Sequence, residues 1–262
     1  MMENLDAEVG LSGLHEWLAS IESRFSIEID ECRQLAFEHA LTGYAESLGE
    51  SLESLLSRSK SGLLDSENWS MILHLATNHE TRFFRSPAAI KQIVQICQNI
   101  THPKVLSVGC STGEEPYSIA AALYAAGHNT FEIHGTDISA VCIKTAKLGI
   151  YKQHPNISSL VAGLMPEQRI RFHPWVKGMV KFEQHNIMQD RPVQILKPNV
   201  IITQNMLIYY REETRYEILN RLASMLGVGG YLITAPAETL GWRTPAMTRV
   251  QNSQINVFVR TS

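Results

Sequence analysis

The chain has 262 residues, of which 44% are hydrophobic and 19% are charged, a composition typical of a globular protein with a sizeable core. No stretch approaches the roughly 20 apolar residues of a membrane span, and the acidic start MMENLDAEVG lacks the basic region of a secretory signal, so we expect a cytoplasmic protein without membrane insertion. The four cysteines lie far apart and the ten histidines form no metal-binding motif, which predicts neither disulfides nor a metal site.

Residues 1–75 predict a small, all-helical domain. Apolar side chains recur at helical spacing, as in Leu14, Leu18, Ile21 and Phe25. This segment holds 14 acidic and 4 basic residues, a net charge of −10, whereas residues 76–262 carry a net +7. The asymmetry predicts two units of different surface character. Nucleic acid is not an expected partner, because phosphate binding relies on Lys and Arg.

After residue 100 the pattern changes to short apolar runs separated by helical stretches. The expected strands are 105–108, 131–135, 199–203, 230–234 and 255–259, and the expected helices between them are 116–126, 140–148 and 215–226. This alternation predicts an α/β fold with a mostly parallel sheet covered on both faces. Ligands of such sheets bind at the carboxyl ends of the strands.

The stretch LSVGCSTGEEPYSIA, residues 106–120, places a glycine turn at the end of the first strand. Glu114 and Glu115 follow the turn, where they favour the helix dipole but repel a pyrophosphate. S-adenosylmethionine carries a sulfonium and an ammonium group and no phosphate, so we expect this cofactor, with S-adenosylhomocysteine as product. Asp137 closes the next strand and is placed for the ribose hydroxyls. The alternative is that both glutamates are only favourable first-turn residues.

Further segments follow the glycine turn and the acidic strand end in a recognisable order. They are TRFFRS (81–86), GCSTGEEPYSIA (109–120), GTDISAVCIKTAKLGIY (135–151), VKFEQHNIM (180–188) and ITQNMLIYYREETRYEILNRLASMLGVGGYLI (202–233). Together they resemble the CheR-type chemotaxis protein-glutamate O-methyltransferases. The resemblance implies a Rossmann-like class I methyltransferase sheet whose last strand is antiparallel, over residues 76–262, preceded by the helical domain 1–75.

The resemblance implies methyl transfer from S-adenosylmethionine to glutamate side chains of a methyl-accepting chemosensory receptor, through the cytoplasmic helical domain of that receptor. The implied cofactor-binding residues are His79, Thr81, Arg85, Gly109, Glu115, Asp137, Asn186, Ile187, Gln204 and Asn205. Arg85 and Tyr209 are the implied catalytic residues, Arg85 holding the incoming carboxylate and Tyr209 lying beside the reactive methyl. No general base is expected, because a glutamate with a pKa of about 4.3 is ionised at neutral pH.

Several features depart from the family pattern. His79 stands where the family has asparagine, and Gln204 where it has arginine. The insert at about 152–180 looks short, and its sequence MPEQRIRFHPWVKGMVKF (165–182) leaves room for little of the β-subdomain that docks a receptor tail peptide, so we expect no tail-peptide tethering. The family's helical domain is typically basic, whereas residues 1–75 are acidic. This predicts an unusual receptor or a contact through the positively charged second domain.

Three other functions stay open. The chain could bind S-adenosylmethionine or S-adenosylhomocysteine as a regulatory module without turnover, or it could methylate another protein or a small carboxylic acid. The pathway is equally open between flagellar, pilus-linked and other signalling systems. A nicotinamide dehydrogenase is disfavoured, because Pro116 stands where its fingerprint requires a third glycine.

Overall fold

The computed structural model describes residues 2–165, 169–189, 191–195 and 197–262. The chain forms two compact units, which we call the helical unit (Met1–Asn78 with Tyr209–Thr214) and the sheet unit (His79–Ile208 with Arg215–Ser262). The boundary between the units after Asn78 lies three residues beyond the predicted domain boundary at 75. The segment 209–214 joins the helical unit because the Glu28 amide donates to the Tyr209 carbonyl at 2.9 Å and Arg211 pairs with Glu28 at 2.6 Å.

The helical unit contains the predicted run of helices. They are α1 (Met2–Phe25), α2 (Glu31–Ser47), α3 (Leu52–Lys60) and α4 (Ser66–Ala76). Asp65 is the N-cap of α4, and its carboxylate accepts the Asn68 amide at 2.8 Å in a capping box. The fully buried ring of Trp17 meets Trp69 edge to face, with centroids 6.3 Å apart. The core of this unit therefore holds a large aromatic pair.

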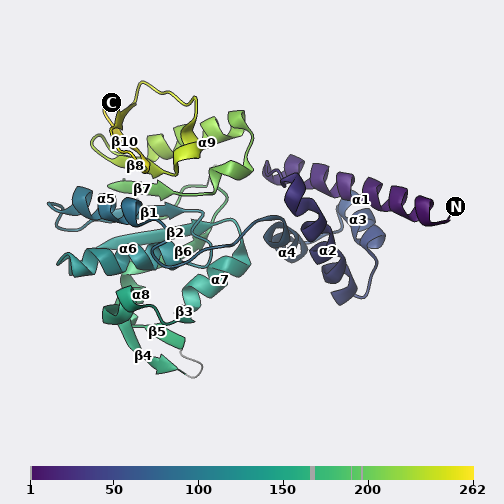
Figure 1. Ribbon diagram of the computed structural model, residues 1–262, viewed down its shortest axis with the longest axis horizontal. Coiled ribbons are helices and arrows are strands. Elements are labelled where there is room, and N and C mark those ends of the chain that lie inside the picture. Colours follow the sequence, from purple (N-terminus) through teal and green to yellow (C-terminus); the bar gives the residue numbers. More distant parts are fainter. Residues whose placement is uncertain (1, 166–168, 190, 196) are drawn as a thin grey trace. The chain divides into compact units, whose positions relative to one another are not determined.

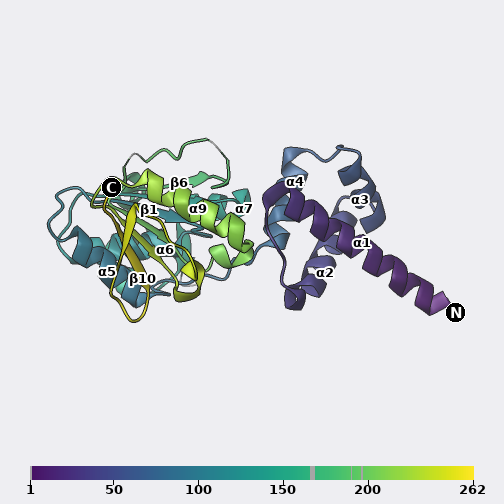
Figure 2. The same ribbon diagram turned by 90° about the horizontal axis from the view of Figure 1, so that it is seen from above.

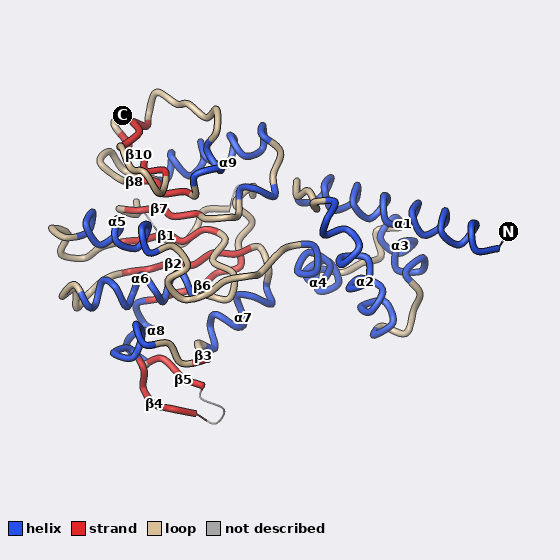
Figure 3. Tube along the Cα trace, viewed as in Figure 1, coloured by secondary structure: helices blue, strands red, loops and turns tan. Residues whose placement is uncertain are grey.

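The sheet unit is built on seven strands (Figure 1, Figure 3). These are β1 (Lys104–Val108), β2 (Glu132–Asp137), β6 (Val180–Gln184), β7 (Val200–Thr203), β8 (Tyr231–Thr234), β9 (Met247–Val250) and β10 (Asn256–Arg260). Their order is β6-β2-β1-β7-β8-β10-β9. The first five are parallel to one another, whereas β10 is antiparallel to both its neighbours. The predicted α/β fold with an antiparallel last strand is confirmed.

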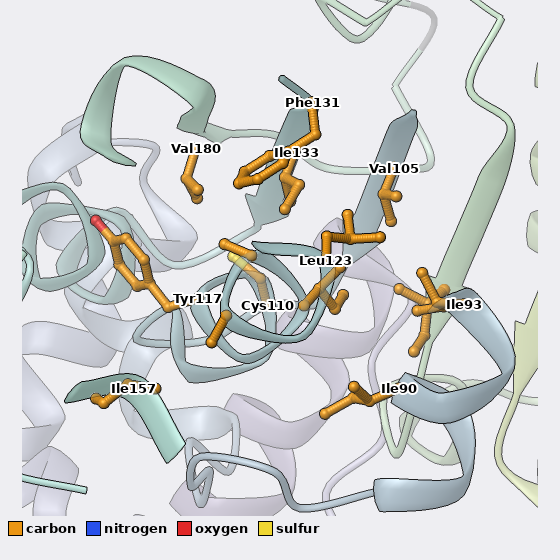
Figure 4. Packing of buried hydrophobic residues seen from close by; sticks show 14 of the residues in the cluster. Ile90, Ile93, Val105, Cys110, Tyr117, Leu123, Phe131, Ile133, Ile157 and Val180 are labelled. Atoms are coloured by element: carbon orange, nitrogen blue, oxygen red, sulfur yellow. The ribbon is translucent and has the colours of Figure 1, made fainter. Parts of the chain in front are cut away.

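Helices cover both faces of this sheet. α5 (Pro87–Cys97), α6 (Glu114–Ala125) and α7 (Ala140–Leu148) contribute to one buried cluster, with alternate strand residues such as Val105, Ile133 and Ile202. Figure 4 shows Ile90, Leu123 and Val105 among these converging side chains. The intervening strand residues lie outside the cluster because successive side chains point to opposite faces. α9 (Glu212–Met225) lies on the other side of the strands from α5 and α6 (Figure 2).

Between α7 and β6 the chain forms a second, antiparallel sheet of order β3-β5-β4 (Figure 3). Its elements are β3 (Ile150–Lys152), the 3-10 helix η1 (Pro155–Leu160), β4 (Val161–Met165), β5 (Arg169–Phe172) and α8 (Pro174–Met179). The sequence predicted room for little of a β-subdomain here. Three strands nevertheless fit, because each needs only three to five residues. Residues 166–168 of the quoted segment lie outside the described residues.

Around the large sheet, the sequence analysis also did not predict α5, β6 or β9. α5 precedes the first strand, and β6 and β9 form the two edges of the large sheet. β9 lacks the alternation of buried and exposed side chains that marks a strand in sequence, because three of its four residues are exposed. Among the described residues, no helix is both long and apolar enough to cross a bilayer.

Candidate functional site

The turn after β1 is shaped by left-handed backbone at Gly109 (φ +74°) and Gly113 (φ +99°). The amides of Gly109 and Cys110 both donate to the Thr136 carbonyl, at 2.8 and 3.0 Å, which fastens the turn to the end of β2. A side chain on Gly109 would lie 2.7 Å from Cγ of Met206. The turn is therefore in close contact with the loop after β7, and only glycine fits there.

Asp137 is the last residue of β2 and is buried. One carboxylate oxygen accepts the Ser111 amide at 2.8 Å, and the other accepts the Ser139 amide at 2.9 Å. The His185 amide donates to its backbone carbonyl at 2.9 Å. Asp137 thus joins the glycine turn, the start of α7 and the loop after β6 at one point of the sheet edge.

Glu114 and Glu115 open α6, and both are partly buried. Burial raises the pKa of Glu115 to about 7, although a hydrogen bond from Ser107 at 2.8 Å opposes the shift and Arg85 opposes it further. Burial also raises the pKa of Glu114. The pKa of the Cys110 thiol is raised first by burial and then by the charges of Asp137 and Glu115. The turn therefore combines acidic side chains with a neutral thiol at Cys110.

Residues 79–85, which precede the first strand in the chain, contact this turn. The His79 carbonyl accepts the Ser111 hydroxyl at 3.1 Å, and the His79 Nδ1 lies 3.1 Å from the Cys142 thiol. Thr81 is half-buried in the same segment. Exposed Arg85 donates to the Glu80 carbonyl at 2.7 Å.

The two aromatics before Arg85 anchor the segment. Phe83 and Phe84 are partly buried and pack against the buried cluster. Phe84 has a left-handed backbone (φ +56°), and its amide donates to the Ser118 hydroxyl in α6 at 2.9 Å. This contact holds the backbone directly before Arg85 against α6.

The loops after β6 and β7 supply the remaining predicted residues. The Asn186 side-chain oxygen accepts the Met188 amide at 2.9 Å, and the neighbouring Ile187 is buried. Gln204 follows β7, and its side-chain Nε2 is a buried donor without a hydrogen-bond partner among the described residues. Asn205 has a left-handed backbone (φ +58°). Both loops leave the same sheet edge as Gly109 and Asp137.

Tyr209 is the one predicted site residue that the structure assigns to the helical unit, whereas the others belong to the sheet unit. It ends the 3-10 helix η3 (Leu207–Tyr209). The guanidinium of Arg33 lies 5.8 Å from the centre of its ring. The ring therefore has a cationic neighbour within the helical unit.

Sequence reasoning missed two residues of this region. Ser111 links His79 to Asp137 through its hydroxyl and its amide. Glu238, in the 3-10 helix η4 (Pro236–Thr239), is fully buried and accepts the amides of Met206 and Leu207, both at 2.9 Å. An acidic residue just after an apolar strand was the signal used for Asp137, and the same signal was present after YLIT.

These residues fit S-adenosylmethionine. The partly buried carboxylate of Glu115 suits a sulfonium or ammonium group, and Asp137 retains lone pairs for ribose hydroxyls. The buried Nε2 of Gln204 offers a donor for the carboxylate of the cofactor. A pyrophosphate would meet Glu114, Glu115 and Asp137 together, an arrangement that repels it.

The strand order, with one antiparallel strand inserted next to the edge, and the acidic glycine turn define a class I, S-adenosylmethionine-dependent methyltransferase fold. Residues 79–257 match the family model described as the CheR methyltransferase, SAM binding domain. The chain belongs to the CheR methyltransferase family. S-adenosylmethionine is the cofactor of this domain.

The chain is similar to several proteins named as methyltransferases. A chemotaxis protein methyltransferase of Vibrio parahaemolyticus is 31% identical over an alignment 186 positions long, which covers 63% of this chain and 66% of that protein, just under two thirds of its length. Another, from Borreliella burgdorferi, is 26% identical over an alignment 260 positions long, which covers 90% of this chain and 91% of that protein. The Synechocystis magnesium protoporphyrin IX methyltransferase is 15% identical with a TM-score of 0.42, covering 75% of this chain and 95% of that one.

Proposed function

We propose that this protein transfers a methyl group from S-adenosylmethionine to glutamate carboxylates of a methyl-accepting chemosensory receptor, forming glutamate methyl esters in the cytoplasm. The observation that carries the proposal is the glycine turn, where the carboxylates of Glu115 and Asp137 lie close enough to the Cys110 thiol for their charges to raise its pKa, an arrangement that favours a cationic ligand. Membership of the CheR family supports the receptor as acceptor, because related proteins are named chemotaxis methyltransferases.

Cofactor binding is divided among the loops at the carboxyl edge of the sheet. We assign Glu115 and Asp137 to the ribose and methionine portions, and Asn186 with Ile187 to the adenine. Gln204 and Asn205 would contact the methionine end, while Gly109 allows the cofactor close to the backbone. His79, Thr81 and Arg85 would close the pocket.

Alignment, rather than acid–base chemistry, would carry the reaction. When bound, the cofactor supplies an electrophilic methyl group. Arg85 has N–H groups beyond the one that donates to Glu80, and a guanidinium can hold a carboxylate through two parallel hydrogen bonds. We assign Tyr209 the role of orienting that carboxylate. Orientation of this kind can lower a barrier by about 7–11 kcal/mol. No general base is required, because the accepting carboxylate is already ionised at neutral pH.

The receptor contact remains a separate proposal. We infer a helical cytoplasmic segment of the receptor as partner, because side chains on one helix face present several carboxylates in a row. Docking of a receptor tail peptide on β3-β5-β4 is not part of the proposal. The second candidate function, a binding module without turnover, draws on Gln204 and His79, which replace the family's arginine and asparagine.

The test has two stages. Calorimetric titration with S-adenosylmethionine and S-adenosylhomocysteine should give micromolar binding that Asp137→Ala abolishes. Radiolabelled S-adenosylmethionine should then label receptor cytoplasmic fragments, and alkali should release the label as methanol, as it does from methyl esters. Binding without labelling of any receptor fragment would favour the regulatory module. Labelling that resists alkali would point to a different acceptor atom.

A charge-preserving variant examines the role of Arg85. Arg85→Lys keeps the positive charge but loses the two-pronged geometry, so methyl transfer should fall while cofactor affinity changes little. Full activity in this variant would remove Arg85 from the proposed alignment.

A further inference from the structure

Glu238 is a fully buried carboxylate in the short 3-10 helix that follows β8. Its Oε1 accepts the amides of Met206 and Leu207, each at 2.9 Å, and its Oε2 accepts the Ala235 amide at 2.9 Å. All three donors are backbone groups of loops at the carboxyl edge of the sheet. One side chain therefore joins the loop after β7 to the loop after β8.

The loop after β7 is the one that carries Gln204 and Asn205. Asn205 directly precedes the first bonded amide and has the left-handed backbone (φ +58°) that a non-glycine residue adopts only when its surroundings hold it there. Met206 in turn lies against Gly109, where a methyl group would approach its Cγ to 2.7 Å. A continuous series of contacts thus runs from Glu238 through Met206 to the glycine turn.

The charge of Glu238 also acts on the site. Burial raises its pKa to about 7, while the three backbone hydrogen bonds and Arg215 oppose the shift. The charge of Glu238 is one of the causes that raise the pKa of Glu115. Two carboxylates therefore share this edge of the sheet, one facing the proposed cofactor site and the other bonded beneath the neighbouring loop.

We propose that Glu238 is a positioning residue for the methionine end of the cofactor, holding Asn205 and Met206 in the conformation that shapes this part of the pocket. The proposal rests on the proposed function only in taking Gln204 and Asn205 as cofactor contacts. It requires no receptor. Glu238 itself need not touch the cofactor, because its carboxylate oxygens are occupied by backbone amides.

Three variants of the full chain test this role. Glu238→Ala removes all three acceptor bonds, whereas Glu238→Gln keeps one oxygen that can still accept the Met206 and Leu207 amides. The matched control is Asn252→Ala in the loop between β9 and β10, where the Asn252 Oδ1 accepts the Gln254 and Ile255 amides at 2.9 and 3.3 Å. Both wild-type side chains fix a loop through backbone amides, but only Glu238 bonds the loop after β7.

The measurements are amide hydrogen exchange in the cofactor-free protein and calorimetric binding of S-adenosylhomocysteine. In Glu238→Ala we expect faster exchange at Met206 and Leu207 and binding weaker by at least about tenfold, a loss of about 1.4 kcal/mol. Glu238→Gln should recover most of the affinity, with its pH profile shifted to lower pH because Glu115 loses a neighbouring charge. Asn252→Ala should bind within about twofold of wild type.

The outcomes separate this proposal from the proposed function. Faster exchange in Glu238→Ala with unchanged affinity would overturn the positioning role, and so would unchanged exchange. If Glu238→Ala does not fold, Glu238→Gln decides: its neutral oxygen is a weaker acceptor than a carboxylate, so exchange at Met206 and Leu207 should be faster, and unchanged exchange together with an unshifted pH profile would overturn the role. Wild-type protein that binds S-adenosylhomocysteine but methylates no receptor would refute the proposed function and leave this inference intact.

Discussion

Several residues of the site have a left-handed backbone. Gly109, Ser111, Gly113 and Asn205 all have positive φ, although two of them carry side chains. Such conformations cost about 1–3 kcal/mol each for non-glycine residues and persist where surrounding contacts impose them. The strain lies where the chain must turn sharply at the end of a strand and leave room for a ligand.

Gly113 permits the most direct test of this strain. An added methyl group would lie 2.8 Å from the Tyr151 hydroxyl and 2.9 Å from Ala146 Cβ, so Gly113→Ala should lower the free energy of unfolding by about 2–4 kcal/mol. Gly127→Ala is the control, since Gly127 has a similar φ of +94° but open space around it, and its cost should stay near 1–2 kcal/mol. Equal losses in urea denaturation would show that packing at Gly113 adds nothing.

The proposed contact between Glu115 and the cofactor predicts that cofactor binding depends on pH. Its pKa is raised to about 7 by burial, so part of the population is protonated in the free site at neutral pH, while a cationic ligand favours the ionised form. Affinity for S-adenosylmethionine should therefore rise from about pH 6 to about pH 8 and then level off, with a proton released on binding below pH 7. Glu115→Gln should bind more weakly and with a smaller slope. Calorimetry in buffers of different ionisation enthalpy measures the proton, and a flat wild-type profile would contradict the assignment.

At the scale of elements, the small sheet depends on aromatic contacts with α6. The ring of Phe172 in β5 stacks on Tyr117 at 3.9 Å with an angle of 13°, and the Tyr151 hydroxyl in β3 donates to the Thr112 carbonyl at 2.5 Å. Both contacts end in or next to the turn that begins α6. The small sheet therefore supports the helix that carries Glu115.

Removing the Phe172 ring should weaken that support. Phe172→Ala should lower the free energy of unfolding by about 3–5 kcal/mol, because Phe172 is almost fully buried and its truncation leaves a cavity. Trp175→Ala is the control of comparable size, since Trp175 is 39% exposed and packs on Tyr124, and it should cost less than about 1.5 kcal/mol. The comparison is made by chemical denaturation followed by circular dichroism. A larger loss at Trp175 would refute the support that Phe172 is expected to provide.

At the scale of the whole molecule, the two compact units have separate cores and opposite net charges. Chains with more than one compact unit often unfold in more than one step, so scanning calorimetry should resolve two transitions. S-adenosylhomocysteine at about 100 times its Kd should stabilise the sheet unit by about 2.7 kcal/mol and leave the other transition unchanged. Asp137→Ala should abolish the shift. A single transition that moves as a whole would show instead that the units unfold together.

Sequence alone determined the local features of this protein. The period change after residue 100, the glycine turn with Glu114 and Glu115, and the acidic strand end at Asp137 predict an α/β fold and favour a cationic ligand, because each signal depends on neighbouring residues. The sequence also placed Gly109 and Asp137 at strand ends and Glu115 at the helix start that follows, and parallel strands bring those ends to one edge of a sheet. The order of the motifs then indicated the family that the chain resembles.

Only the tertiary structure decided which distant residues meet. Glu238 reaches Met206 across 32 positions of sequence, and Ser111 joins His79 to Asp137, contacts that no local pattern encodes. The small sheet escaped prediction because its strands are too short to show periodicity. Tyr209 was predicted with the sheet domain from its place in a motif, yet backbone and charged contacts group it with the helical unit. Burial and long-range hydrogen bonds, which depend on the folded chain, decide such placements.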